Sequence, residues 1–151
     1  MGEVKTEIEN AIQKLGLSQN DIRLLNDPTA EIIFKDCLNH FVRSGDRRWW
    51  WEDFIEPSFF FEGTDKPYEI LKDIIPELSK NVWWIVEDIQ EPFYPVYEAN
   101  PKVLGDIIGQ CFAFEYYVIN KEKVWLLCEN HHNRLIGVGK VLKEKNIQKI
   151  S

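Results

Sequence analysis

Short apolar runs that are dense in aromatic residues constrain the fold of this chain more than any other feature of its sequence. They follow residue 47, they are too short for buried helices, and breaks such as Glu56-Pro57 separate them. Aromatic and β-branched residues favour strands, so we expect strands here. The expected strands are 47–54, 58–61, 82–86, 94–97, 112–119 and 124–128, and the last two form a hairpin through the turn at 120–123.

Three consecutive tryptophans lie in the first of these expected strands. Successive side chains of a strand face opposite ways, so Trp49 and Trp51 are expected on one face of the sheet and Trp50 on the other. Core packing is the favoured interpretation for these residues, and for Trp84 in the run 82–86. The alternative is an exposed tryptophan face that serves as a binding platform.

Helical periodicity precedes the aromatic runs. Apolar residues at three- and four-residue spacing predict a helix over 4–15, which Gly16 ends. Ser18, with Asp21 three places later, predicts a second short helix over 18–25. Asp27-Pro28 favours the start of a third helix, with Asp27 as its cap. The apolar face of the third helix is expected to consist of Ile32, Ile33, Cys37, Leu38 and Phe41.

Further helices are expected at 67–75, after Asn100-Pro101, and over 135–147, the last weakened by Gly137 and Gly139. Helices first, then a mostly antiparallel tryptophan-rich sheet with helices packed on it, is an α+β pattern. The length of 151 residues suits one domain, so we expect a single α+β domain over residues 1–151.

The charge and hydropathy of the chain indicate where the protein is located and which classes of partner it can bind. No apolar run approaches the roughly 20 residues that span a bilayer, and the first residues lack the apolar core of a signal peptide, so a cytoplasmic protein is expected. The net charge of −7 opposes binding to nucleic acid and to anionic membranes, and it attracts basic proteins. The three cysteines are expected to be free and buried, and no cofactor is expected.

The segment 128–133 is the most suggestive for chemistry, because it combines Cys128, Glu129, His131 and His132. Adjacent histidines point in different directions in a strand or helix, so we expect no metal site. A small hydrolase that uses Glu129, His131 or His132 is one alternative. The other is a structural turn, tied down by the side chains of 130–133.

Six acids lie in or beside the aromatic runs, where a charge is costly to bury without a partner. One interpretation is an acidic, aromatic surface that binds a basic protein; the other is a solvated face with ion pairs to Arg47, Arg48 and Arg134. With the two histidines, the candidate partner-binding residues are Glu52, Asp53, Glu87, Asp88, Glu115, Glu129, His131 and His132.

Four sequence blocks carry a resemblance to a known family: RRWWWEDF at 47–54, VWWIVED at 82–88, VYEA at 96–99 and FEYYVINKEKVWLLCENHHNRLIGVG at 114–139. Here the chain resembles a family of small, uncharacterised proteins from Bacillus and related Firmicutes. Some members are encoded beside secreted polymorphic toxins of the LXG type and are regarded as their immunity proteins. The resemblance implies a non-enzymatic protein that binds and neutralises a cognate toxin, and it supplies no catalytic residues. A small hydrolase and a small-ligand-binding domain are the alternatives.

Overall fold

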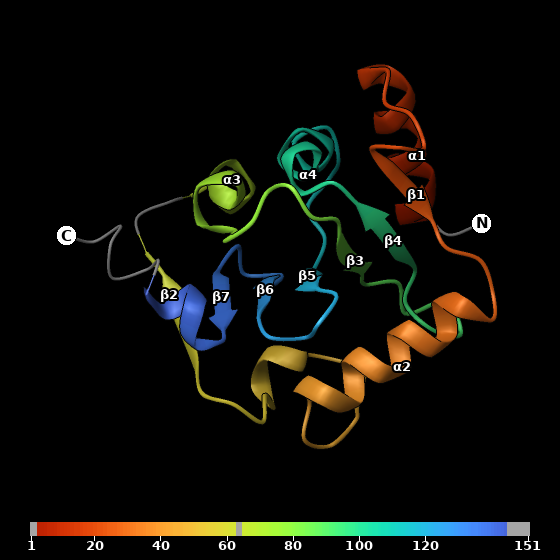
Figure 1. Cartoon of the computed structure of the whole chain (residues 1–151). Helices are drawn as coiled ribbons and strands as arrows, with labels where there is room; N and C mark the ends of the chain where they lie inside the picture. The colour runs from red at the N-terminus through yellow and green to blue at the C-terminus, as the bar shows by residue number, and fades with distance from the viewer. Residues whose placement is uncertain (1–2, 63–64, 145–151) are drawn as a thin grey trace.

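Strands from residue 22 to residue 138 form one antiparallel sheet in the part of the chain that the structure describes. The structure is a computed structural model, and it describes residues 3–62 and 65–144 (Figure 1). The strand order in the sheet is β1-β4-β3-β5-β6-β7-β2, and every neighbouring pair is antiparallel. The strands are β1 (Ile22–Leu24), β2 (Ser58–Phe61), β3 (Val82–Val86), β4 (Val96–Ala99), β5 (Tyr116–Asn120), β6 (Leu126–Glu129) and β7 (Leu135–Val138).

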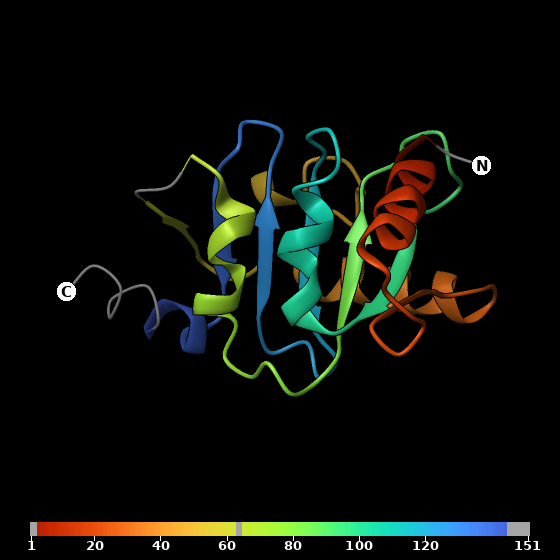
Figure 2. The same cartoon turned by 90° about the horizontal axis from the view of Figure 1, so that it is seen from above.

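Helices cover both faces of this sheet. The α-helices α1 (Glu3–Leu15), α3 (Leu71–Ile74) and α4 (Pro101–Ile108) lie on one face, and α2 (Thr29–Phe41) lies on the other (Figures 1 and 2). Two short 3-10 helices, η1 (Trp50–Glu52) and η2 (Pro67–Ile70), and a helical stretch at 140–144 complete the described elements. The expected α+β fold is confirmed.

Two hydrophobic cores follow from this layering, one on each face of the sheet. The strands alternate as their sequence predicts: Tyr116 and Val118 of β5 enter the core under α1, α3 and α4, whereas Tyr117 and Ile119 enter the core under α2. Trp84 is fully buried in the first core, and Trp50 in the second. The central strands are buried on both faces, which explains why they read as continuous apolar runs.

Several elements agree with the sequence pattern. Helix α1 ends at Gly16, whose φ of 68° lies in the left-handed region. Asn100 caps α4 by accepting a hydrogen bond from the backbone N–H of Lys102 at 3.0 Å. The turn between β5 and β6 is held by Asn120, whose Oδ1 accepts the N–H groups of Val124 and Trp125. The expected hairpin is confirmed.

The helix expected at 18–25 is wrong. Ser18 and Asp21 do form the predicted local bonds, since Asp21 accepts a hydrogen bond from the Ser18 N–H at 2.9 Å. The turn does not continue, because Ile22 to Leu24 pair with the edge of β4 as strand β1. Pairing with the edge of β4 therefore determines the conformation of residues 22–24 more strongly than the capping pattern of Ser18 and Asp21 does.

The strand expected at 47–54 is also wrong. Residues Trp50 to Glu52 form η1, and Trp49 before it has a φ of 52° in the left-handed region. This bend places Trp50 in the core, where its ring stacks on Tyr117 with 4.1 Å between centroids. The expected alternation of the three tryptophans across a sheet therefore does not occur.

The last corrections concern α2 and the C-terminal segment. Helix α2 exists, but Asp27 does not cap it, since no side-chain cap hydrogen bond forms at its start. Its buried face includes Phe34 and leaves Ile32 63% exposed, contrary to expectation. Residues 135–138 of the expected helix 135–147 form β7, a helix covers 140–144, and 145–147 lie outside the described residues.

Candidate functional site

One end of the sheet brings together residues from four distant segments. Strand β3 ends there, β5 begins, and β6 ends. The backbone N–H of Glu87 donates to the carbonyl oxygen of Glu115 at 2.9 Å, which makes the two acids cross-strand neighbours. Glu129 is paired with Tyr116 in the neighbouring ladder. Three of the six acids named from the sequence therefore lie at this end.

The two faces of the sheet separate these acids. Glu87 and Glu115 continue the alternation of Ile85 and Tyr117 and face the core under α2. Glu129 follows Leu127 on the opposite face, where it accepts a hydrogen bond from the Tyr116 hydroxyl at 2.8 Å. Burial raises the pKa of the Glu129 carboxyl above its ordinary value, although the bond from Tyr116 acts in the opposite direction.

Glu115 is the centre of the site. Its side chain accepts hydrogen bonds from the Trp51 indole N–H at 3.1 Å and from the Tyr117 hydroxyl, and His131 Nδ1 lies 3.4 Å from its Oε1. The residue is only 1% exposed. Within the described residues it forms no ion pair with a lysine or arginine. The Trp51 indole and the Tyr117 hydroxyl, two neutral donors, therefore hold the buried side chain of Glu115 in place.

Glu87 lies beside this carboxylate and is half-buried. Burial is the largest cause that raises its pKa, and the adjacent Glu115 carboxyl raises it further, to about 7. His131 and Arg48 act in the opposite direction. Burial and the neighbouring Glu115 carboxyl together place the pKa of Glu87 near neutral pH.

The two histidines lie in a tight turn between β6 and β7. Asn130 Oδ1 accepts the N–H groups of His132 and Arg134, each at 3.0 Å, so the expected structural turn is confirmed. The expectation that the two rings point in different directions is wrong, because their centroids are 4.0 Å apart. Both rings contact Trp51, with centroid distances of 5.8 and 5.9 Å.

The remaining acids have different roles in the local structure. Glu52 is exposed in η1. Asp53 accepts the Ser44 N–H at 2.8 Å, and hydrogen bonds from Ser44 lower the pKa of its carboxyl. Asp88 is buried, and its Oδ1 accepts the Gln90 N–H at 3.2 Å. Asp53 and Asp88 therefore stabilise loops, whereas Glu52 remains open to a partner.

Arg47 and Arg134 do not form the ion pairs that were expected with the six acids. Arg47 donates to the carbonyl oxygens of Glu91 and Ile89, at 2.6 and 2.8 Å, and its guanidinium lies over the ring of Tyr94. Arg134 forms an ion pair with Glu62 at 3.8 Å. The side chain of Arg47 thus holds the loop after β3 by bonding to the backbone carbonyl oxygens of that loop.

The hydrolase alternative loses the arrangement that the sequence suggested. The two histidines lie together with Glu115, while Glu129 is on the opposite face of the sheet, so Glu129 does not converge with them. Cys128 is fully buried, and burial raises the pKa of its thiol well above the ordinary value. A protonated, buried thiol is a poor nucleophile.

Sequence reasoning missed Trp49 and Trp51 as part of this site, because it favoured the core for all three tryptophans. Trp49 is 50% exposed, and Trp51 bridges η1 to Glu115 and both histidines. The sequence Ser44-Gly45-Asp46 could have indicated that the tryptophans do not lie in a strand, because these residues favour a turn. In the structure Asp46 accepts a hydrogen bond from the Arg48 N–H at 2.9 Å. A turn so close to the tryptophans argues against a regular strand.

One known protein family matches nearly the full length of the chain. Residues 1–150 match the family described as "Family of unknown function (DUF6756)". The chain belongs to this family. No curated protein and no solved structure matches this DUF6756 chain.

Two further observations concern the described residues of this DUF6756 protein. Among residues 3–62 and 65–144, no three His, Cys, Asp or Glu side chains are grouped so that they could hold a metal ion. Over the same ranges, no helix has the length and apolar character needed to cross a bilayer.

Proposed function

We propose that this protein is a non-enzymatic binding protein that neutralises a basic protein partner. The proposed contact surface, here named the acidic–aromatic edge, consists of Trp49, Trp51, Glu52, Glu87, His131 and His132. The resemblance of the sequence blocks to immunity proteins makes a secreted toxin domain the proposed partner, met in the cytoplasm. No catalytic residue, cofactor, nucleic acid or membrane belongs to this proposal.

The observation that carries the proposal is the pair of adjacent carboxyls, Glu87 and Glu115. Within the described residues neither forms an ion pair with a lysine or arginine. Burial is the largest cause that raises the pKa of Glu87, and the Glu115 carboxyl raises it further, to about 7. A lysine or arginine side chain of a partner, placed beside Glu87, would favour its charged form, as Arg48 and His131 do within the protein.

The aromatic residues of the edge support the same function. Trp49 is held half-exposed by a left-handed backbone conformation that bulky residues rarely adopt. Tryptophan is enriched among the residues that dominate binding energy at protein interfaces, and its ring face attracts cations. The N–H of the exposed Glu52 donates to the Trp49 carbonyl oxygen at 3.0 Å, so an exposed ring and an exposed carboxylate lie in one turn. This combination suits a lysine- or arginine-rich surface.

The test is co-expression with the toxin domain encoded by the neighbouring gene, followed by association kinetics over a range of salt concentrations. We expect Glu52→Gln/Glu87→Gln to slow association about tenfold at low salt and less at high salt, because exposed charges are screened by ions. Asp53 and Asp88 are left unchanged in this variant because their hydrogen bonds hold loops.

The matched control is Glu69→Gln/Asp106→Asn, which changes the formal charge equally at two exposed positions on η2 and α4. It should slow association far less, since it lies on helices that cover the other face. Equal slowing in both variants would mean that net charge, and not the acidic–aromatic edge, guides the partner. Failure of the wild-type protein to bind the toxin, with cells killed despite its presence, would reject the immunity function.

A further inference from the structure

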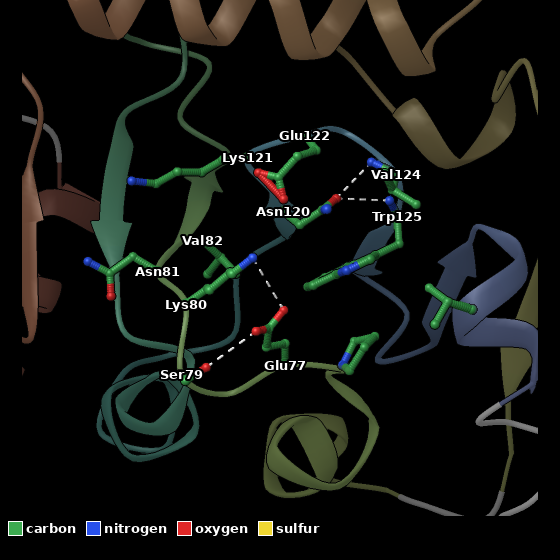
Figure 3. Close-up of a pocket in the computed structure, with 12 residues that line it drawn as sticks. Glu77, Ser79, Lys80, Asn81, Val82, Asn120, Lys121, Glu122, Val124 and Trp125 are labelled. Carbon is green, nitrogen blue, oxygen red and sulfur yellow. Dashed lines mark hydrogen bonds and ion pairs between the residues drawn. The ribbon is translucent and has the colours of Figure 1, made fainter.

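A pocket of about 570 Å³ opens at the other end of the sheet, where β3 begins and β5 ends (Figure 3). Val82 and Asn120, which pair across these two strands, line it together with the loop at 76–81 and the turn at 120–125. Trp125 and Val141 add apolar surface. This volume is in the range of roughly 300–1,000 Å³ that small-molecule sites occupy.

Trp125, which is 5% exposed, gives the pocket a narrow wall that is fixed in position. Its backbone N–H donates to Asn120 Oδ1 at 3.0 Å, which fixes the turn that carries it. Behind it lies Gly139, where an added Cβ would be only 3.0 Å from the Trp125 Cβ. In Figure 3 the indole ring reaches from the turn toward Lys80 and Glu77 across the pocket. The wall is therefore formed before any ligand arrives, which lowers the entropic cost of binding.

The charges that line the pocket are largely matched within the protein. Lys80 forms an ion pair with Glu77 at 3.6 Å. Lys121 forms an ion pair with Glu98 and lies over the ring of Trp83, and Figure 3 shows its side chain directed away from Trp125. Neither lysine is left with an unmatched positive charge. Glu122 also lines the pocket, but it is exposed, so water solvates its charge. An anionic ligand would have to displace the carboxylate from one of the two lysines.

An amide group is the polar group that remains for a ligand. Asn120 uses its Oδ1 to hold the turn, and its Nδ2 donates no hydrogen bond within the described residues. Asn81 donates from Nδ2 to Glu98 at 3.5 Å, and in Figure 3 its side chain is directed away from Trp125 and Asn120. The Nδ2 of Asn120 is thus the amide donor that the described residues leave for a ligand in this pocket.

We propose that this pocket binds a small, flat, mostly apolar molecule that carries one uncharged hydrogen-bonding group, such as an amide. The ring of the ligand packs against Trp125, Val124 and Val141, and its polar group accepts a hydrogen bond from Asn120 Nδ2. Aromatic ligands gain from offset or edge contacts with an indole beyond the burial of apolar area. The proposal concerns a different end of the sheet from the acidic–aromatic edge and does not rest on the function proposed for it.

Three probes of nearly equal shape test the chemistry: benzamide, which is neutral, benzoate, which is an anion, and benzamidine, which is a cation. The measurement is a titration followed by ¹H–¹⁵N correlation spectra. We expect benzamide to bind with a millimolar Kd and to shift the Trp125 indole N–H and the Val82 and Lys121 amides. The two charged probes should bind about tenfold more weakly. Tighter binding of benzoate or benzamidine would overturn the assigned ligand class, and no shift at Trp125 with any probe would overturn the site.

Two variants connect the signal to the pocket. Val141→Trp fills it and should weaken benzamide binding at least tenfold, whereas Ile32→Trp, at an exposed position of α2, should bind as the wild type does. Glu77→Gln leaves Lys80 without its carboxylate and should shift preference from benzamide toward benzoate, a readout that remains if Val141→Trp fails to fold. Equal binding in Val141→Trp and the wild type would reject the pocket, and so would an unchanged preference in Glu77→Gln.

Discussion

At the scale of single residues, three adjacent tryptophans have three different environments. Trp50 is fully buried and stacked on Tyr117, Trp51 donates a hydrogen bond to Glu115, and Trp49 is half-exposed. The left-handed backbone at Trp49 causes this difference, because it turns the chain into η1. Burial, and not residue type, therefore decides what each tryptophan contributes.

The first prediction compares two of these residues. Trp50→Ala should lower the free energy of unfolding by about 3–5 kcal/mol, because it leaves a large cavity in the core under α2. Trp84→Ala should do the same in the other core. Trp49→Ala should cost less than about 1 kcal/mol, since half of its side chain is already in water. Urea denaturation measures all three, and similar losses for Trp49→Ala and Trp50→Ala would contradict the packing described.

The second prediction concerns the pH dependence of stability through Glu87. Its pKa in the folded protein, about 7, lies above its ordinary value of 4.5. Between these values the folded protein retains a proton that the unfolded chain has released, so stability should fall as pH rises from about 4.5 to about 7. Because Glu87 is half-exposed and solvent screens its charge, the loss should be only about 1 kcal/mol.

Glu87→Gln should remove this loss, which makes the variant more stable than the wild type at pH 8 and of similar stability near pH 4.5. Thermal unfolding across this pH range is the measurement. Glu52→Gln, at an exposed position of η1, is the control and should retain the wild-type profile. If Glu87→Gln and the wild type lose stability in parallel as pH rises, the raised pKa of Glu87 beside Glu115 is wrong.

At the scale of elements, segments with a clear apolar pattern of their own were predictable, and segments that depend on distant partners were not. Helix α1 and strand β3 agree with their patterns, because their apolar residues repeat over enough positions to define a buried face. Strand β1 and helix η1 do not, because long-range contacts decide them: β4 provides β1 with a partner, and Glu115 and Tyr117 hold η1. Local sequence patterns cannot predict contacts with residues so distant in the chain.

The candidate site was predictable in part for the same reason. Period-two alternation and the hairpin place Glu115 and Glu129 near the end of the sheet on opposite faces. The contact of Trp51 with Glu115, however, joins residues 64 positions apart. Only the fold brings them together, so sequence reasoning named the acids without finding the tryptophan that covers one of them.

The third prediction concerns the pairing of β2 with β7. Phe59 is opposite Gly137, and an added Cβ at Gly137 would lie 2.8 Å from the Phe59 ring and 2.9 Å from the Phe61 ring. Gly137→Ala should therefore destabilise the protein by about 1–3 kcal/mol through overpacking. Phe59→Ala vacates this space, so the double variant should lose less than the sum of the two single losses. Additive losses in denaturation would show that the close approach has no energetic effect.

At the scale of the whole molecule, the two ends of the sheet differ in chemistry. The acidic–aromatic edge contains two adjacent carboxyls beside aromatic rings, and the pocket at the other end has apolar side chains and two lysines that are paired with carboxylates. Since no residue belongs to both, substitutions at one end should leave binding at the other unchanged. Benzamide binding to Glu52→Gln/Glu87→Gln tests this fourth prediction, and a tenfold change in its Kd would show that the two ends are coupled.

The last prediction links the protonation of Glu87 to partner binding. At pH 7 about half of the Glu87 carboxyls carry a proton, as follows from a pKa of about 7. A partner's lysine or arginine beside Glu87 favours the charged form, so complex formation should release protons and affinity should rise between pH 6 and pH 8. The charged and titratable groups around Glu87 are Glu115, His131, Arg48, Tyr94 and Cys128.

Among these groups, His131 is tested separately from Glu87, because its Nδ1 lies 3.4 Å from the carboxyl of Glu115, the neighbour of Glu87. Calorimetric titration of the toxin domain in phosphate and in Tris, which differ in ionisation enthalpy, counts the protons released. Glu87→Gln should release fewer protons than the wild type, and His131→Asn should retain most of the wild-type release. If Glu87→Gln releases as many protons as the wild type while His131→Asn releases none, the histidine and not the carboxyl pair senses the partner.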